Sequence, residues 1–222
     1  MYKILFIDEE KDTLDDFEEF VDKSDLKGKF EVITTLPAGE LDEMIENIIK
    51  IAPDVIISDY RLNELKTDIN YTVKYTGVDL VEEFQSTRNN FPCFVLTAVD
   101  DEAVNNSDDV NIVYVKSILH KEEVENSKSP FLARVISQIE HYKNRIEKHK
   151  QELAELIEVR KNGDADIDIE RRIIELDDFL EKSIDGKSVL PSEFKTLTNS
   201  NKLDNILNKV DELLKKLDDD AK

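Results

Sequence analysis

The sequence Pro53-Asp54-Val55-Ile56-Ile57-Ser58-Asp59-Tyr60-Arg61-Leu62 decides the fold of this chain. Small and β-branched residues run up to Asp59, and a polar, charged loop follows. A short apolar run bounded by Pro53 is typical of a strand that is buried on both faces of a parallel sheet. Asp59 would then stand at the carboxyl end of that strand, where α/β sheets bind their ligands. A turn or a helix cap would explain a lone aspartate equally well, so other strand ends have to be compared.

Further strands and helices extend this pattern along the first half of the chain. Apolar or alternating runs predict strands, and apolar residues at helical spacing predict helices. Strands are expected at 2–8, 29–36, 53–59, 92–98 and 111–115, and helices at 11–24, from Leu41 to before Pro53, after Gly77 and, short and polar, within 100–109. Strands and helices that alternate at this spacing predict βαβ units, and hence a doubly wound α/β fold with a five-stranded parallel sheet.

Polar side chains stand at the ends of four of these strands. Asp8 and Glu9 follow the first strand, Asp59 ends the third, and Thr97 and Lys116 end the fourth and fifth. Right-handed crossovers bring the carboxyl ends of parallel strands to one edge of the sheet. We therefore expect these five side chains to line one crevice, a convergence that turn chemistry does not explain.

The residue types in this crevice suit phosphoryl transfer. Three carboxylates within a few ångströms repel one another, and one of them stays protonated unless a cation joins them. Mg²⁺ is a suitable cation because it binds one or two carboxylates together with waters and a phosphate. Lys116 adds a fixed positive charge, and Thr97 adds a hydroxyl donor. These groups would neutralise a phosphoryl group while Asp59 attacks it in line.

Four motifs together resemble the receiver domain of two-component response regulators. Ile4-Leu5-Phe6-Ile7-Asp8-Glu9-Glu10 resembles its first strand and acidic pair, and Asp54-Val55-Ile56-Ile57-Ser58-Asp59 the strand that carries its phosphoacceptor. Leu96-Thr97-Ala98 resembles its switch hydroxyl segment, and Val115-Lys116 its lysine. The resemblance covers roughly the first half of the chain and implies a flavodoxin-like receiver fold.

The resemblance also implies a role for each residue of the crevice. Asp59 would accept a phosphoryl group from a histidine kinase or a phosphotransfer protein. Thr97 and Lys116 would bind the phosphoryl oxygens, and Thr97 would move toward the new phosphate, which reshapes the face formed by the fourth helix, the fifth strand and the fifth helix. The implied Mg²⁺ ligands are the carboxylates of Asp8, Glu9 and Asp59 and the backbone carbonyl of Arg61. The chain would be a signalling phosphoacceptor rather than an enzyme, catalysing only its own phosphorylation and dephosphorylation.

The segment that would relay this change departs from the family pattern. Ser117 replaces the proline that usually follows the lysine, and the fourth helix is short and polar. The aromatic switch residue usually lies three positions before the lysine, where this chain has Val113. Tyr114 lies one step along the strand and is expected on its opposite face. The usual pairing of a switch hydroxyl with an aromatic relay is therefore not expected.

The long loop over residues 63–76 also departs from the family, which usually has a tighter connection here. It is either a tolerated surface insertion or a partner-selective lid. In the second case Tyr71, Lys66 or Lys74 would reach the phosphoryl site.

From Pro130 onward a heptad period predicts helices rather than βαβ units. The stripe of the first helix consists of Leu132, Val135, Ile139, Tyr142, Ile146, His149, Leu153, Leu156 and Arg160. Gly163 is expected to end this helix, and two more helices are predicted at 167–184 and between Leu203 and Leu217. The predicted domains are thus a receiver over 1–128 and an α-helical hairpin or coiled-coil extension over 129–222, continuous with the last receiver helix. His149 either sets the helix register or makes a pH-sensitive contact.

Composition excludes several classes of function. The net charge of −21 disfavours binding to nucleic acid or to an anionic membrane surface. No apolar run reaches the roughly 20 residues that span a bilayer, and no signal peptide is apparent at the start. The single cysteine, Cys93, excludes an internal disulfide, so we expect a cytoplasmic protein.

The helical half contains no motif for DNA reading, nucleotide binding or metal binding, so a protein output partner or a second copy of the chain is expected to bind it. A phosphate shuttle or sink without a separate output is an alternative. A structural scaffold with a relic receiver is another, and a helical half that acts on a different receiver as a phosphatase or adaptor is a third.

Overall fold

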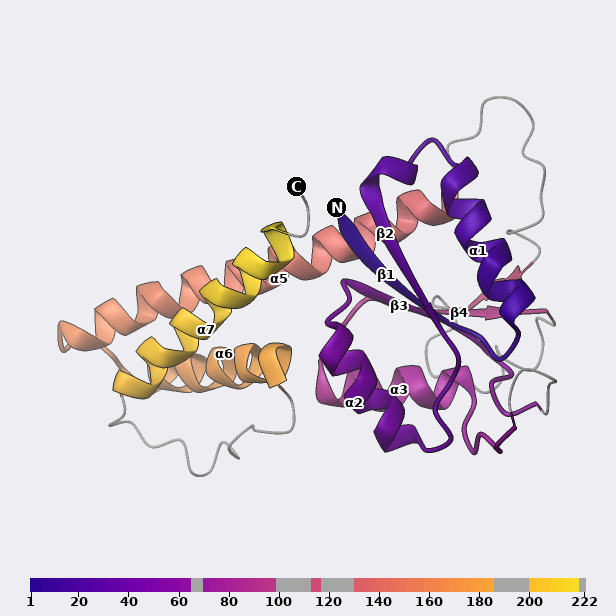
Figure 1. Ribbon diagram of the computed structural model, residues 1–222. Coiled ribbons are helices and arrows are strands. Elements are labelled where there is room, and N and C mark those ends of the chain that lie inside the picture. The colour runs from indigo at the N-terminus through magenta and orange to yellow at the C-terminus, as the bar shows by residue number, and fades with distance from the viewer. Residues whose placement is uncertain (65–69, 99–112, 117–129, 186–199, 220–222) are drawn as a thin grey trace. The chain divides into compact units, whose positions relative to one another are not determined.

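The computed structural model describes residues 1–64, 70–98, 113–116, 130–185 and 200–219 (Figure 1). Its strands are β1 (Tyr2–Ile7), β2 (Phe30–Thr35), β3 (Val55–Asp59), β4 (Cys93–Thr97) and β5 (Val113–Val115). Its helices are α1 (Lys11–Lys23), the short 3-10 helix η1 (Lys27–Lys29), α2 (Leu41–Ile51), α3 (Gly77–Thr87), α5 (Pro130–Lys161), α6 (Ile167–Asp185) and α7 (Ser200–Asp219). The polar helix predicted within 100–109, and Ser117, lie outside the described residues.

The five strands form one parallel sheet in the order β2-β1-β3-β4-β5. This is the doubly wound, flavodoxin-like order, in which the crevice at the switch point lies between β1 and β3. The predicted α/β fold with a five-stranded parallel sheet and a helical extension is therefore confirmed. In this register Asp59 pairs with Leu96 and Thr97 with Val115, so the ends of β3, β4 and β5 meet at one edge.

Helices cover both faces of the sheet because its central strands are apolar on both faces. All five residues of β3 and of β4 are buried. On one face, α1 and the first turns of α5 pack against alternate residues of β1, β3 and β4. On the other face, α2 and α3 bury Met44, Ile45, Ile48, Val78, Leu80, Val81 and Phe84 (Figure 1). This two-sided core holds the strand ends in fixed register.

The chain divides into two compact units, and two helices run through the division. One unit comprises Met1–Phe84 and Pro92–Ile139, and the other comprises Gln85–Phe91 and Glu140–Asp219. Helices α3 and α5 each belong to both. We call the part of the second unit from Glu140 to Asp219 the helical arm.

The arm is built from α5, α6 and α7. Gly163 ends α5 with a left-handed φ of 86°, a conformation that glycine adopts without strain. Asp166 then caps α6, because its Oδ1 accepts hydrogen bonds from the backbone N–H groups of Asp168 and Ile169 at 3.0 and 2.9 Å. The apolar residues buried within the arm include Ile146, Leu153, Ile157, Ile173, Leu176, Leu180, Ile206 and Val210.

Ion pairs connect the three helices of the arm, and the ring of His149 on α5 stacks on that of Phe179 on α6. Arg172 of α6 forms a two-pronged pair with Glu152 of α5, at 2.6 and 3.0 Å. Lys150 of α5 pairs with Asp211 of α7 at 2.5 Å. Toward the end of the predicted heptad stripe, Ile157 is buried with 3% exposure, whereas Leu156 is only half-buried. The stripe drifts because a straight helix has 3.6 residues per turn rather than 3.5.

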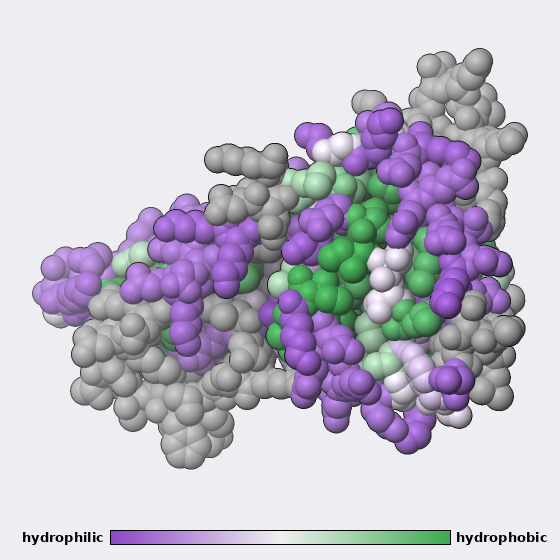
Figure 2. Space-filling model, viewed as in Figure 1, coloured by the Kyte–Doolittle hydropathy of each residue, from purple (hydrophilic) through white to green (hydrophobic). Residues whose placement is uncertain are grey.

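The surface is strongly polar, as the composition predicts. Figure 2 shows hydrophilic residues over α1, α2 and α7, with apolar residues between α1 and α2, where the half-buried β2 forms the edge of the sheet. Within the described part of the chain, no helix is both long enough and apolar enough to cross a membrane.

Candidate functional site

Asp59 is held at the end of β3 by backbone contacts on both sides. The N–H of Tyr60 donates to the carbonyl of Leu96 at 2.8 Å, which continues the β3–β4 pairing past Asp59. The first residue of α3, Gly77, donates its N–H to the carbonyl of Tyr60 at 2.8 Å. A Cβ at Gly77 would lie 1.9 Å from the Asp59 carbonyl oxygen, so only glycine allows α3 to begin here. The start of α3 is thus in direct contact with the backbone of Asp59.

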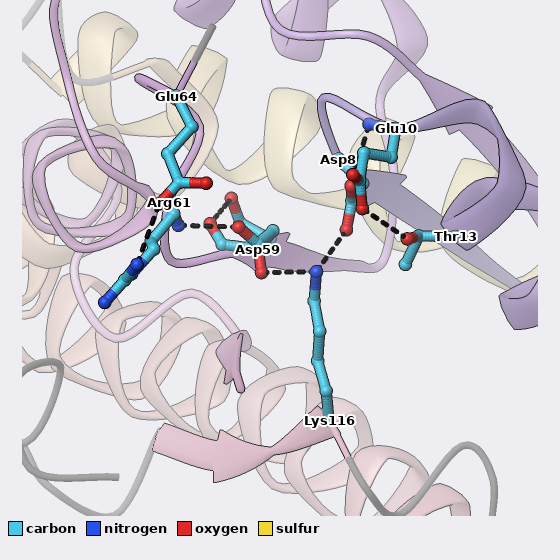
Figure 3. Close-up of polar contacts among 8 residues, drawn as sticks. Asp8, Glu10, Thr13, Asp59, Arg61, Glu64 and Lys116 are labelled. Atoms are coloured by element: carbon cyan, nitrogen blue, oxygen red, sulfur yellow. Dashed lines mark hydrogen bonds and ion pairs between the residues drawn. The ribbon is translucent and has the colours of Figure 1, made fainter. Parts of the chain in front are cut away.

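The structure brings the three predicted carboxylates and the predicted lysine together, and Figure 3 shows Lys116 between Asp8 and Asp59. Oxygen atoms of Asp8, Glu9 and Asp59 all lie within 4.8 Å of one another, and all three side chains are buried. The Nζ of Lys116 lies 2.7 Å from Oδ1 of Asp59 and 2.9 Å from Oδ2 of Asp8. One ammonium group therefore bridges two carboxylates that come from β3 and from the residue after β1.

Burial and mutual repulsion dominate the electrostatics of this cluster. Burial, with the charges of Asp59 and Asp8 added, raises the pKa of Glu9 to about 8. Burial also raises the pKa of Asp8, although Lys116 opposes this shift. Burial would lower the pKa of Lys116, but Asp59 and Asp8 outweigh it and raise that pKa, so the lysine stays charged. One positive charge does not balance three carboxylates, and the raised pKa of Glu9 favours its protonated form at neutral pH when no cation is bound.

The cluster fits a divalent cation with oxygen ligands. The Oε2 atom of Glu9 is buried and accepts no hydrogen bond from the described residues. A buried carboxylate oxygen is costly unless a donor or a metal ion satisfies it. The oxygen donors in this crevice are those that Mg²⁺ prefers. A bound cation would take the place of the Glu9 proton and would relieve the repulsion from Asp8 and Asp59.

Arg61, the fourth predicted metal ligand, lies beside the cluster. Its backbone N–H donates to Oδ2 of Asp59 at 2.6 Å, which fixes the orientation of that carboxylate. Its carbonyl accepts the N–H of Glu64 at 3.1 Å, and a carbonyl oxygen has two lone pairs, so it could also bind a cation. Its guanidinium donates to Oε1 of Glu64 at 2.8 Å (Figure 3). The sequence pattern does not reveal this last contact.

Thr97 ends β4 one position after Leu96, the register partner of Asp59, and is 1% exposed. Its place at the end of β4 is the predicted one, and its role as the phosphoryl-binding hydroxyl stays a prediction.

The loop before α3 does not place the predicted lid residues at the site. The hydroxyl of Tyr71 donates to the carbonyl of Pro37 at 2.6 Å, and Lys74 pairs with Glu40 at 2.5 Å. Tyr75 makes a similar bond to the carbonyl of Ala38 at 2.7 Å. In this structure Tyr71 and Lys74 do not reach the phosphoryl site as the lid alternative required, because residues between β2 and α2 bind their polar ends. Lys66 lies outside the described residues.

Tyr114 faces the α1 and α5 side of the sheet, as strand alternation predicts. Its ring packs edge-to-face against Phe94 and Phe131, with ring centroids 5.7 and 5.2 Å away and interplanar angles of 62°. Arg134 of α5 lies over this ring at 5.5 Å and donates to its hydroxyl at 2.5 Å. The sequence shows no signal for this pair, because nothing in the helical period of α5 marks Arg134 as a partner of β5.

No family model and no curated protein matches the chain. Among solved structures, the chain is similar to the response regulator RcsB in its complex with DNA, with 15% sequence identity and a TM-score of 0.38. The match covers 94% of this chain and 98% of that one. The assignment of the fold rests on the strand order and register described above.

Proposed function

We propose that this chain is a response-regulator-type phosphoacceptor, in which Asp59 takes a phosphoryl group from a histidine kinase or a phosphotransfer protein. The observation that carries the proposal is the bridge from Lys116 to both Asp59 and Asp8, beside a buried Glu9 oxygen that has no hydrogen-bond partner among the residues the structure describes. A cluster that served stability alone would gain from neutral or apolar residues, because uncompensated buried charge is destabilising. The cluster is therefore best explained by a cation and a phosphoryl group that bind here.

The residues of this cluster would divide the chemistry between them. One oxygen of Asp59 attacks the phosphorus of the donor, the P–N bond of the phosphohistidine breaks, and its electron pair stays on the imidazole nitrogen. Asp8, Glu9 and Asp59 would hold Mg²⁺ with the Arg61 carbonyl, and the ion would neutralise phosphoryl oxygens. Lys116 and Thr97 would bind the other oxygens. Hydrolysis of the acyl phosphate by water restores Asp59, so the only chemistry is self-catalysed phosphorylation and dephosphorylation.

The output in this proposal is a protein–protein interaction of the helical arm, with a second copy of the chain as one candidate partner. The arm is a distinct compact unit with polar helices. The net charge of −21 opposes contact with nucleic acid phosphates. We predict no binding to nucleic acid or membranes, and a cytoplasmic location.

The test is phosphorylation by a small phosphodonor with Mg²⁺, followed by mass spectrometry of the intact chain. We expect one added phosphoryl group in the wild type and none in Asp59→Asn. Asp54→Asn is a matched control, because it makes the same change next to the other end of the same buried strand, where Oδ2 accepts the backbone N–H of Lys3 at 2.7 Å. It should still be phosphorylated.

Each alternative function predicts a different result in this assay. A relic receiver that acts as a scaffold predicts no incorporation from the donor or from a cognate kinase, and that result would refute the proposal. A phosphate shuttle or sink predicts normal incorporation without any change in partner binding or association of the arm, which light scattering with and without Mg²⁺ and beryllofluoride would measure.

A further inference from the structure

The segment from Gly77 to Thr97 begins and ends at the candidate site. At its first residue, Gly77 leaves no room between α3 and the carbonyl of Asp59. At its last residue, β4 ends in Thr97, one position past the partner of Asp59. A change in the position of Asp59 or Thr97 therefore acts on both limbs of this segment, the helix α3 and the strand β4.

The far end of the same segment is a hydrogen-bonded turn between α3 and β4. The side-chain amide of Gln85 donates to the carbonyl of Phe91 at 2.9 Å, and the N–H of Phe91 donates to the carbonyl of Arg88 at 3.1 Å. Asn90 adopts a left-handed φ of 58° to make this turn. Residues Gln85–Phe91 form one compact unit with the arm rather than with the sheet.

Two side chains of α5 attach this turn to the arm. The ring of Tyr142 meets Phe91 at 5.4 Å and 71°, and Tyr142 is only 5% exposed. Arg145 donates from Nη2 to the carbonyl of Asn90 at 3.3 Å, and its guanidinium also lies over Phe179 of α6 at 5.6 Å. Arg145 thus contacts the turn and α6 at once.

The contact continues from Phe179 back to α5. His149 stacks on the Phe179 ring at 4.4 Å and 23°, and its Nδ1 lies 2.9 Å from the carbonyl of Arg145. A shift of the turn Arg88–Phe91 would therefore displace side chains that contact both α5 and α6. By contrast, Arg134 and Tyr114 join β5 to the first turns of α5, which lie in the same compact unit as the sheet.

We propose that Asp59 and the arm are coupled through α3, the turn Arg88–Phe91 and the contacts of Tyr142 and Arg145. This inference rests on the proposed function and names the route by which phosphorylation would reach α6. The position usually held by an aromatic relay is Val113, and the β5–α5 pair of Tyr114 and Arg134 would serve the stability of the core. We call the contacts of Tyr142 with Phe91 and of Arg145 with Asn90 the joint, and in this proposal a change at the site alters the joint and through it α6.

The experiment measures amide hydrogen exchange in the full chain with and without Mg²⁺ and beryllofluoride. In the wild type we expect exchange to change both within 77–97 and within α6. Arg145→Met removes the guanidinium but keeps the apolar stem, and Tyr142→Leu removes the ring contact but keeps apolar volume. In both variants the response within 77–84 and 93–97 should remain, and the response within α6 should be lost.

Arg134→Met is the matched control, because Arg134 also lies on α5, also stacks over an aromatic ring and also donates one hydrogen bond. It should keep the α6 response. Coupling is reciprocal, so loss of the joint should also change the affinity for beryllofluoride, by about fivefold or more if the coupling is of typical size. Arg134→Met should leave that affinity unchanged.

The outcomes separate this inference from the function on which it rests. An α6 response that survives both joint substitutions, or that disappears in Arg134→Met, overturns the proposed route while Asp59 remains a phosphoacceptor. A wild type with a response at 77–97 and none in α6 also overturns it. No response anywhere, together with no phosphorylation of Asp59, overturns the proposed function and the inference with it.

Discussion

Replacing Glu9 by glutamine should stabilise the metal-free protein at alkaline pH. The pKa of Glu9 rises from 4.5 to about 8 because the side chain is buried beside Asp59 and Asp8. Between these two values the folded chain keeps a proton on Glu9 that the unfolded chain has lost, so stability falls as pH rises through this window. The Glu9→Gln variant carries no such proton, and it should escape this loss.

The size of the effect follows from the same shift. At about 1.36 kcal/mol per pKa unit, a change from 4.5 to about 8 sets an upper limit on the order of 5 kcal/mol for the gain at pH 8. Asp8 and Asp59 share the free-energy cost of ionisation with Glu9, so the gain in the variant should be smaller than this limit. A gain of about 1 kcal/mol would already raise Tm by about 2–4 °C in a chain of this size.

The assay is thermal unfolding with a chelator, at pH 5 and at pH 8, followed by the same scans with Mg²⁺. We expect Glu9→Gln to melt near the wild type at pH 5 and above it at pH 8. Mg²⁺ should stabilise the wild type, by about 2.7 kcal/mol at 100 times its Kd, and should stabilise the variant much less.

Glu10→Gln is the control, because Glu10 is the next residue along the chain and its side chain accepts a hydrogen bond from Thr13 outside the carboxylate cluster. It should behave as the wild type in every condition. Melting of Glu9→Gln below the wild type at pH 8 without metal would contradict the raised pKa of Glu9. An equal gain from Mg²⁺ in the variant and the wild type would contradict the role of Glu9 as a metal ligand.

Two further substitutions and one labelling experiment have defined outcomes. Gly77→Ala should destabilise the chain by about 1–3 kcal/mol and slow phosphorylation, measured with a small phosphodonor, because the new methyl would meet the Asp59 carbonyl at 1.9 Å; an unchanged rate would show that α3 does not position Asp59. Arg172→Met should lower the stability of the arm by no more than about 1 kcal/mol, seen in the exchange of α6, because Arg172 and Glu152 are 42% and 34% exposed; a much larger loss would mean that the pair orders the whole hairpin. Burial raises the pKa of the Cys93 thiol, so thiol reagents should label the native chain only as fast as it opens; rapid labelling with Tm unchanged would contradict the buried position of β4.

The sheet could be predicted because its signals are local. The apolar run that ends at Asp59 needs no partner to be recognised as a strand, and the crossover rule then places the other strand ends beside it. Asp8, Glu9 and Lys116 follow from this rule, and the structure brings their side chains within reach of Asp59. The helices of the arm could be predicted for the same reason, since heptad spacing is a property of single segments.

What the sequence does not reveal are the contacts chosen by packing between distant segments. Tyr71 and Lys74 could have turned toward the crevice, but the carbonyl of Pro37 and the carboxylate of Glu40 lie closer to them in the fold. Arg145 contacts Asn90, which is 55 residues away in sequence, and no periodicity connects the two. Such contacts depend on how elements are oriented, which propensity and spacing do not encode.

The hydrogen bond from Gly77 to Tyr60 means that α3 begins almost at the point where the chain leaves β3. The loop between Tyr60 and Gly77 therefore has ends that a hydrogen bond already joins. The entropy of closing a loop grows only slowly with its length, by about 0.6 kcal/mol for each doubling. This position should therefore accept a longer peptide, or a whole inserted domain, while β3 and α3 stay where they are. It is a natural place to fuse a reporter that reads the phosphorylation state of Asp59 at close range.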